Sequence, residues 1–211
     1  MEEKRNDILD TSKKMFAEYG IRSVSMDDIC KQLNISKKTL YQCFDNKADL
    51  LEALIDFEMK ETSKEAAKIK TQARNAIHSL LLVSKAMSRV STNSNPAIAY
   101  DLKKYYPELY NKFIQKKREL AFKGITMNME RGIEEGIYRN DLNLELTAQL
   151  YIKKVEQMHD KDFMENIKYS PESLFKVMFE NHIRGIANAK GIEIFEKEKE
   201  NLNFNIDDTT V

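Results

Sequence analysis

Apolar residues recur along most of the chain with the spacing of α-helices. The first stripe ends at Gly20 and consists of Ile8, Leu9, Met15, Phe16 and Tyr19. This spacing of three to four residues is that of the buried face of an amphipathic helix. No stretch alternates apolar and polar residues between turn dipeptides, as a half-buried strand would. The pattern therefore predicts an all-α fold.

Prolines and glycines mark where these helices begin and end. Each proline can be the first residue of a helix, where an N–H has no partner in any case; they are Pro96, Pro107 and Pro171. Three glycines suit the left-handed residue that closes a helix, namely Gly20, Gly136 and Gly191. Longer amphipathic helices are expected at about 47–70, 72–91, 96–105, 107–135, 144–160 and 171–190. These form a helical bundle.

Shorter helices precede the bundle. Ser25 and Asp28 have the spacing of a capping box, and one face of the helix they open carries Met26, Ile29, Cys30 and Leu33. Asn34 follows, and asparagine tolerates the left-handed conformation of a sharp corner. Ser36 then caps a second short helix, whose buried side is Leu40, Tyr41 and Phe44. Helices this short require packing on the first helix to be stable.

Two short helices joined by a tight turn, the second with polar residues at its start, are typical of a helix-turn-helix that docks in the major groove of DNA. The residues expected to read bases are Lys37, Lys38, Thr39 and Gln42. Those expected to contact phosphates are Ser25, Ser36, Tyr41 and Lys47. The core beneath them is expected to contain Phe16, Ile29, Leu40 and Phe44.

Charge supports a local DNA-binding surface only. Lys plus Arg equals Asp plus Glu at 34 each, so the whole chain is neutral. From Lys31 to Lys47, however, four lysines stand against one acid, Asp45. The alternative is that these lysines form an ordinary solvated surface.

The remaining composition favours a cytoplasmic protein. The N-terminus lacks an apolar signal-peptide region, and no apolar run approaches the length of a membrane span. Cys30 and Cys43 match no zinc or disulfide spacing, so we interpret them as reduced thiols. A redox role for Cys43 is the alternative.

Residues 8–54, "ILDTSKKMFAEYGIRSVSMDDICKQLNISKKTLYQCFDNKADLLEAL", resemble the DNA-binding domain of the bacterial TetR family of transcriptional regulators. The shared features are an Ile-Leu pair, Phe-Ala-x-x-Gly, a Ser/Thr cap, Leu-Tyr-x-x-Phe and a Lys before a leucine pair. Later, "YYPELYNKF" and "GIEEGIYRNDLNLELTAQLYI" resemble phrases common in the regulatory domain of the family.

The resemblance implies the same base and phosphate contacts as the pattern does. In the family, positions matching Ser25, Tyr41 and Lys47 contact phosphate. Two positions depart from the family pattern. Asn34 replaces a common turn glycine, and Cys43 stands where an aromatic residue or histidine often touches the DNA backbone.

The last two long helices carry apolar residues over more than one face, so they need a second packing partner. The resemblance implies that helices 144–160 and 171–190 form a four-helix homodimer interface; an intramolecular core is the alternative. A dimer implies a near-palindromic DNA operator. The expected domains are 1–46 for DNA binding, 47–190 for regulation and dimerisation, and 191–211 as a partly disordered acidic tail.

In the family a small molecule enters the regulatory bundle and releases the DNA. The sequence does not identify this effector. Aromatic and methionine residues that either line its pocket or fill the core are Met87, Tyr100, Tyr105, Phe113, Phe122, Met127 and Tyr151. A repressor is thus expected, with an architectural or cell-division DNA-binding protein as the alternative.

A helical-bundle enzyme is the other functional class considered. Glu156 and His159 have the Glu-x-x-His spacing of di-iron bundles, but such a site needs two of these motifs. His78 and His182 have no acid three residues before them. We therefore expect no catalytic residues, cofactor, metal or membrane partner.

Overall fold

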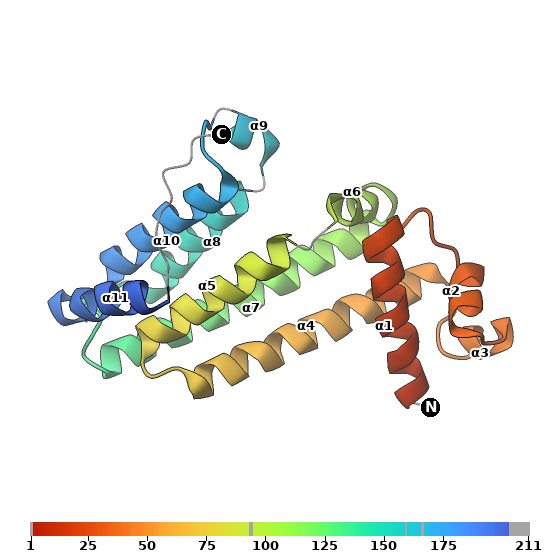
Figure 1. The fold of residues 1–211 in the computed structure, drawn as a ribbon, viewed down its shortest axis with the longest axis horizontal. Helices are drawn as coiled ribbons and strands as arrows, with labels where there is room; N and C mark the ends of the chain where they lie inside the picture. The colour runs from red at the N-terminus through yellow and green to blue at the C-terminus, as the bar shows by residue number, and fades with distance from the viewer. Residues whose placement is uncertain (1, 93–94, 159, 166, 203–211) are drawn as a thin grey trace. The chain divides into compact units, whose positions relative to one another are not determined.

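The computed structural model describes residues 2–92, 95–158, 160–165 and 167–202, and its regular elements there are helices (Figure 1). They are α1 (Glu2–Tyr19), α2 (Met26–Leu33), α3 (Lys37–Tyr41), α4 (Lys47–Gln72), α5 (Ala76–Thr92), α6 (Pro96–Tyr105), α7 (Pro107–Glu134), α8 (Leu144–Gln157), α9 (Lys161–Glu165), α10 (Pro171–Ile186) and α11 (Ala189–Asn201). An isolated antiparallel bridge joins Tyr138 to Ala187. The predicted all-α fold is confirmed. None of the helices within the described ranges is long and apolar enough to cross a bilayer.

The chain forms two compact units. Unit 1 contains residues 1–64 and 91–117, and unit 2 contains residues 65–90 and 118–211. The boundary between the units falls inside α4, α5 and α7. The division at residues 46 and 190 stays a prediction about function, since it separates DNA binding from regulation.

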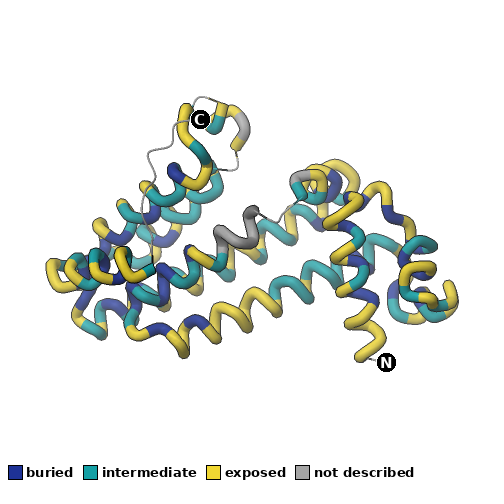
Figure 2. Tube along the Cα trace, viewed as in Figure 1, coloured by how far each residue is buried: buried dark blue, intermediate teal, exposed yellow. Residues whose placement is uncertain are grey.

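Unit 1 has an apolar core around α1. Figure 2 shows α1 with buried and exposed stretches in alternation. Its Ile8, Leu9 and Phe16 are 1–2% exposed. The same cluster takes side chains from α2, α3, the residues before α4, and α4 itself, including Ile29, Leu40, Phe44, Leu50 and Leu51. The four residues expected beneath the DNA-binding surface, Phe16, Ile29, Leu40 and Phe44, are all among these buried side chains. This shared core holds the short helices together, because neither α2 nor α3 is long enough to be stable alone.

Proline and glycine signals locate most helix ends correctly. Pro96, Pro107 and Pro171 each begin a helix, and Gly20 and Gly136 have φ of 82° and 66°. The prediction for Gly191 is wrong. It lies in the first turn of α11, where a Cβ would stand 2.1 Å from the carbonyl oxygen of Ile137. Glycine is required there by the close approach of two backbones and not by a left-handed turn.

The helix expected at 171–190 is in fact two helices. α10 ends at Ile186, and Asn188 begins α11 by accepting the Gly191 N–H on its side-chain oxygen at 3.0 Å. The Asn188 side-chain amide also donates to the Gly136 and Tyr138 carbonyls at 3.1 and 3.3 Å. The helix expected at 144–160 likewise ends at Gln157, and the short α9 follows it.

α11 extends into the region expected to be an acidic tail. Its Phe195 is fully buried in the core of unit 2. The buried carboxylate of Glu198 binds Arg74 at 2.6 Å, and Lys199 binds Glu180 of α10 at 2.8 Å. Residues 191–202 are therefore part of the folded unit, and residues 203–211 lie outside the described part of the chain.

Unit 2 also contains a half-buried histidine between α8 and α10. The ring of His182 stacks on Tyr151 with centroids 4.0 Å apart and an interplanar angle of 27°. Its Nε2 is buried and has no hydrogen-bond partner among the described residues. Burial, and to a smaller extent the positive charge of Lys154, lower the pKa of His182 from 6.5 to about 4. His182 is therefore neutral in the folded protein.

We expect unfolding to become easier as pH falls below 6.5. The unfolded chain binds a proton on His182 near pH 6.5, whereas the folded chain resists it until about pH 4. The difference should reduce the free energy of unfolding by roughly 2 kcal/mol at pH 5, relative to neutral pH. Urea unfolding of the wild type and of His182→Phe, between pH 7 and 5, measures this. The variant should lose most of the slope; an unchanged slope would contradict the assignment.

Candidate DNA-binding surface

The start of α2 carries one of the predicted phosphate-binding residues. Ser25 Oγ accepts the Asp28 N–H at 3.2 Å, and the Asp28 carboxylate accepts the Ser25 N–H at 3.0 Å. These contacts form the capping box expected from the sequence. Hydrogen bonds from the Ser25 side chain and backbone hold the pKa of Asp28 below its ordinary value. Ser25 thus fixes the start of α2 and is exposed to solvent.

The corner between α2 and α3 is held by backbone hydrogen bonds. Asn34 has φ 52° and ψ 45°, the left-handed conformation predicted for it. Its N–H donates to the Lys31 carbonyl at 3.1 Å, and the Ile35 N–H donates to the Cys30 carbonyl at 3.0 Å. Asparagine therefore does at this corner what a glycine would do with less strain.

α3 is a short helix anchored at both ends. Ser36 Oγ accepts the Thr39 N–H at 3.1 Å and lies 2.8 Å from Thr39 Oγ1. Leu40 and, just beyond the helix, Phe44 are buried in the core of unit 1. The inner side of α3 is therefore fixed by two apolar side chains, while its other side is free to face a partner.

The four residues expected to read bases differ in how they are held. Lys38 and Gln42 are exposed. Lys37 is also exposed and forms an ion pair with Asp27 at 2.7 Å. Thr39 is half-buried, and its hydroxyl is held at the Ser36 cap. Lys38 and Gln42 are thus the more accessible pair, and Lys37 and Thr39 are held at the start of α3.

Tyr41 and Lys47, which are both expected to contact phosphates, also differ in their exposure to solvent. Tyr41 is 46% exposed, which suits a phosphate contact. Lys47 is half-buried, and its ammonium donates to the carbonyls of Ile21 and Val24. Burial lowers the pKa of Lys47, an effect that the nearby carboxylate of Asp101 opposes. In the free protein Lys47 therefore ties the start of α4 to the turn between α1 and α2.

A carboxylate from α6 binds a backbone amide of the same turn. Asp101 is 8% exposed and accepts the Arg22 N–H at 2.8 Å. It also lies beside Gly20, where an added Cβ would be 3.3 Å from its carboxylate oxygen. We call the contacts of Lys47 and Asp101 with residues 20–25 the turn clamp. The sequence gives no local signal for it, because Asp101 and Arg22 are 79 positions apart.

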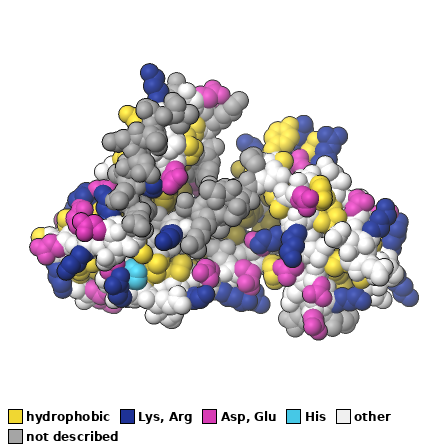
Figure 3. Space-filling view, viewed as in Figure 1, with side chains coloured by type: hydrophobic (Ala, Val, Ile, Leu, Met, Phe, Trp, Pro, Cys, Tyr) yellow, Lys and Arg dark blue, Asp and Glu magenta, His cyan; other side chains and the backbone are white. Residues whose placement is uncertain are grey.

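Figure 3 shows Lys and Arg side chains at the end of unit 1 that carries α2 and α3, although Asp27 and Asp28 of α2 pair with Lys37 and Lys31 there. Lys31, Lys37 and Lys38 are exposed, and Lys47 is half-buried. Cys43, which replaces a residue type that often touches the DNA backbone, is half-buried and a free thiol. Cys30 is also free, and burial raises the pKa of its thiol. The surface thus carries three exposed lysines above the apolar core of unit 1.

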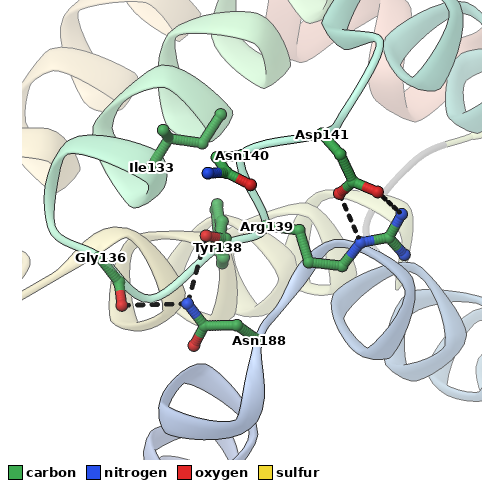
Figure 4. A pocket seen from close by; sticks show the side chains of 7 residues that line it. All are labelled: Ile133, Gly136, Tyr138, Arg139, Asn140, Asp141 and Asn188. Atoms are coloured by element: carbon green, nitrogen blue, oxygen red, sulfur yellow. Dashed lines mark hydrogen bonds and ion pairs between the residues drawn. The ribbon is translucent and has the colours of Figure 1, made fainter.

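Unit 2 has an open cavity of about 370 Å³ beside the loop between α7 and α8 (Figure 4). Its lining residues are Ile133, Gly136, Tyr138, Arg139, Asn140, Asp141 and Asn188. The Arg139 guanidinium and the Asp141 carboxylate bind each other at 3.0 and 3.2 Å, which lowers the pKa of Asp141. Asn188 donates to two backbone carbonyls there. The polar side chains of Arg139, Asp141 and Asn188 are therefore occupied by contacts within the protein. We interpret the cavity as a structural feature of the fold.

The aromatic and methionine residues considered for an effector pocket do not form one group. Half-buried members are Phe113, Phe122 and Tyr151, and exposed members are Tyr100, Tyr105 and Met127. The side chain of Met87 lies outside the described residues. Tyr100 and Tyr105 instead flank the Lys104 ammonium, which lies 5.2 and 5.5 Å from their ring centroids.

The half-motif considered for a metal is only partly described. Glu156 forms ion pairs with Arg118 and with Lys153, and His159 lies outside the described residues. These ion pairs lower the pKa of Glu156, chiefly through the hydrogen bond from Arg118. Within the described ranges no cluster of three or more potential ligand side chains could hold a metal ion.

Comparison with known proteins points to one family. Residues 8–54 match the sequence model of bacterial regulatory proteins, tetR family. A fatty acid metabolism regulator protein of Bacillus subtilis (strain 168) is 27% identical over 188 residues, which cover 86% of this chain and 94% of that protein. Other curated relatives match over 25–31% of their own length.

Solved structures share the fold over most of the chain. A transcriptional regulator from Cytophaga hutchinsonii ATCC 33406 superposes with a TM-score of 0.69 at 19% identity, covering 88% of this chain and 99% of that one. A gamma-butyrolactone receptor (ArpA-like protein) has a TM-score of 0.61 at 14% identity, covering 95% and 97%. The fold is therefore that of these regulators, with a helix-turn-helix and a helical bundle.

We expect Asp101→Ala to destabilise unit 1, because the Arg22 N–H loses its acceptor. The loss should be about 1–3 kcal/mol in the free energy of unfolding, and hydrogen exchange at the Arg22 amide should accelerate. Asp101→Asn keeps an oxygen acceptor and should recover part of the loss. Lys103→Ala, an exposed change on the same helix, is the control and should stay within about 0.5 kcal/mol of wild type. Wild-type stability of Asp101→Ala would refute the clamp.

Proposed function

We propose that this chain, a DNA-binding transcriptional regulator of the TetR family, is a repressor that binds a near-palindromic operator as a homodimer and leaves it when a small molecule binds. The observation that carries the proposal is the α2–α3 surface. It combines a rigid corner at Asn34 with exposed polar residues on a helix whose inner side is buried at Leu40 and Phe44. Repression needs only occupancy of a promoter.

In the proposed complex α3 lies in the major groove. Lys37, Lys38, Thr39 and Gln42 are proposed to meet base edges, and Ser25, Ser36, Tyr41 and Lys47 to meet phosphates. The exposed ion pair between Lys37 and Asp27 is weak, at about 0–1 kcal/mol, so DNA can displace it at little cost. Lys47 would need to share its ammonium between the turn carbonyls and a phosphate.

Dimerisation is proposed through α8 and α10. Three apolar residues on these helices are largely exposed in the single chain: Leu146 at 51%, Leu150 at 55% and Val177 at 42%. Leu146 and Leu150 are four residues apart and therefore share one face of α8. A second copy that covers this face would form a four-helix contact, as expected from the sequence. Recognition helices about 34–36 Å apart would then read two half-sites.

The effector is proposed to bind within the helical bundle and to favour a conformation that fits DNA poorly. Such coupling is typically worth about 1–3 kcal/mol, or a 5- to 150-fold change in affinity. The Bacillus subtilis relative is named for fatty acid metabolism, and one structural neighbour is named a gamma-butyrolactone receptor. Fatty acids and small lactones are therefore the first compounds to test for release of the DNA.

Selection of bound fragments from a random pool of DNA duplexes, at 0.15 M salt, tests the proposal. A near-palindromic site protected by a dimer is the expected result. Many unrelated fragments bound with similar affinity would instead indicate an architectural DNA-binding protein. A protein that enriches no fragment would overturn the proposed function.

We expect Leu150→Glu to separate the dimer, because it puts a charge at the centre of the apolar face of α8. Sedimentation should show a monomer, and operator affinity should fall at least about tenfold because one half-site contact no longer supports the other. Gln149→Glu, an exposed neighbour, is the control for added negative charge. A Leu150→Glu protein that remains dimeric would exclude this face as the interface.

A further inference from the structure

An arginine in the first turn of α1 lies against the end of the helix-turn-helix. The guanidinium carbon of Arg5 is 4.7 Å from the centroid of the Phe44 ring. Phe44 is 1% exposed, whereas Arg5 is exposed. Arg5 therefore covers the outer edge of the core at the point where the chain leaves α3.

The position of Arg5 on α1 explains this contact. Ile8 and Leu9 follow it by three and four residues, so all three share one face of the helix. Ile8 and Leu9 are buried in the cluster that contains Phe44. Arg5 is thus one turn before the buried stripe and reaches over its edge. This spacing is a sequence signal, although it does not distinguish Arg5 from any other solvated helix start.

The aromatic ring holds the guanidinium without neutralising it. A cation over a ring face is oriented by the ring quadrupole and keeps its charge. Arg5 takes part in none of the ion pairs of the described residues. Its N–H groups remain available to an anion, and arginine suits the two oxygens of a phosphate.

Lys47, the cation expected to contact phosphate near the end of α3, is in a different situation. Its ammonium is half-buried and donates to the carbonyls of Ile21 and Val24. Withdrawing it would leave both acceptors without this donor. Arg5 is a cation near the same segment whose charge is not already used within the fold.

We propose that Arg5 binds a phosphate of the DNA backbone beside the major groove occupied by α3. A helix is about 10–12 Å across and the major groove about 12 Å wide, so side chains flanking the helix meet the backbone. Arg5 lies next to Phe44, two residues beyond the proposed base-reading Gln42. The contact positions the protein and carries no sequence preference. This inference rests on the proposed function, since it requires DNA in front of α3.

Salt dependence of DNA binding tests the contact. The affinities of wild type, Arg5→Gln, Arg5→Lys and Lys14→Ala are measured between 0.05 and 0.3 M salt, on the duplex selected above and on a random duplex. Arg5→Gln keeps much of the side-chain stem over Phe44 and removes the charge. Lys14 is exposed and nine residues further along α1, about 180° around the helix, so it is the matched control.

We expect Arg5→Gln to weaken binding to both duplexes about equally, by roughly tenfold at 0.1 M salt. The slope of log affinity against log salt should fall by about 0.9 per subunit, or about 1.8 for a dimer. Arg5→Lys should keep the wild-type slope, and Lys14→Ala should match wild type in both quantities. Thermal unfolding midpoints report any loss of folding.

Two results separate the failures. If wild type binds neither duplex, the proposed function is wrong and the Arg5 contact falls with it. If wild type binds and Arg5→Gln has the wild-type slope, only the Arg5 contact is wrong. A lower midpoint and weaker binding with an unchanged slope would mean that Arg5 merely covers Phe44.

A neutral methylphosphonate at the contacted phosphate should abolish the difference between wild type and Arg5→Gln.

Discussion

The geometry of unit 1 depends on satisfying the backbone of the turn between α1 and α2. Helices of eight and five residues do not persist alone, so α2 and α3 hold their positions only if the segment leading into them is fixed. Lys47 supplies donors to two carbonyls of this turn, and Asp101 supplies an acceptor to one amide. The two side chains come from α4 and α6. Any rearrangement of those helices that moves either group therefore changes the angle at which α2 begins.

The turn clamp stabilises the turn through polar contacts, without additional buried apolar surface. The turn is too short to bury large side chains beyond Ile21 and Val24, and an unpaired buried amide or carbonyl is costly. Charged partners bind such groups more strongly than neutral ones do. The clamp is also readily disturbed, because both of its ends are single side chains. A small displacement elsewhere in unit 1 can therefore alter the position of α3.

Local signals in the sequence identify most of the fold. Ser25 and Ser36 have the caps expected of them, and Asn34 has the left-handed conformation expected at the corner. The end of α10 at Ile186 and the helix α11 are both missed, because the expected helix runs to 190 and residues 191–211 are expected to be a tail. The prediction for Gly191 is wrong because a glycine is required there by the close backbone of Ile137, which is far away in the sequence. The clamp is missed for the same cause. The caps and the corner of the helix-turn-helix can be predicted because each depends on residues a few positions apart in the sequence. Contacts between distant segments have no such local signal.

The separation of buried and exposed positions in and just after α3 has a consequence for how a protein of this fold can diversify. Leu40 and Phe44 bear the packing, while Lys38 and Gln42 are exposed and contribute little to stability. Substitutions at the exposed positions can therefore accumulate after gene duplication without unfolding the product. If α3 reads DNA as proposed, a few substitutions in one short helix can give the product of a duplicated gene a new DNA-binding site on an unchanged core.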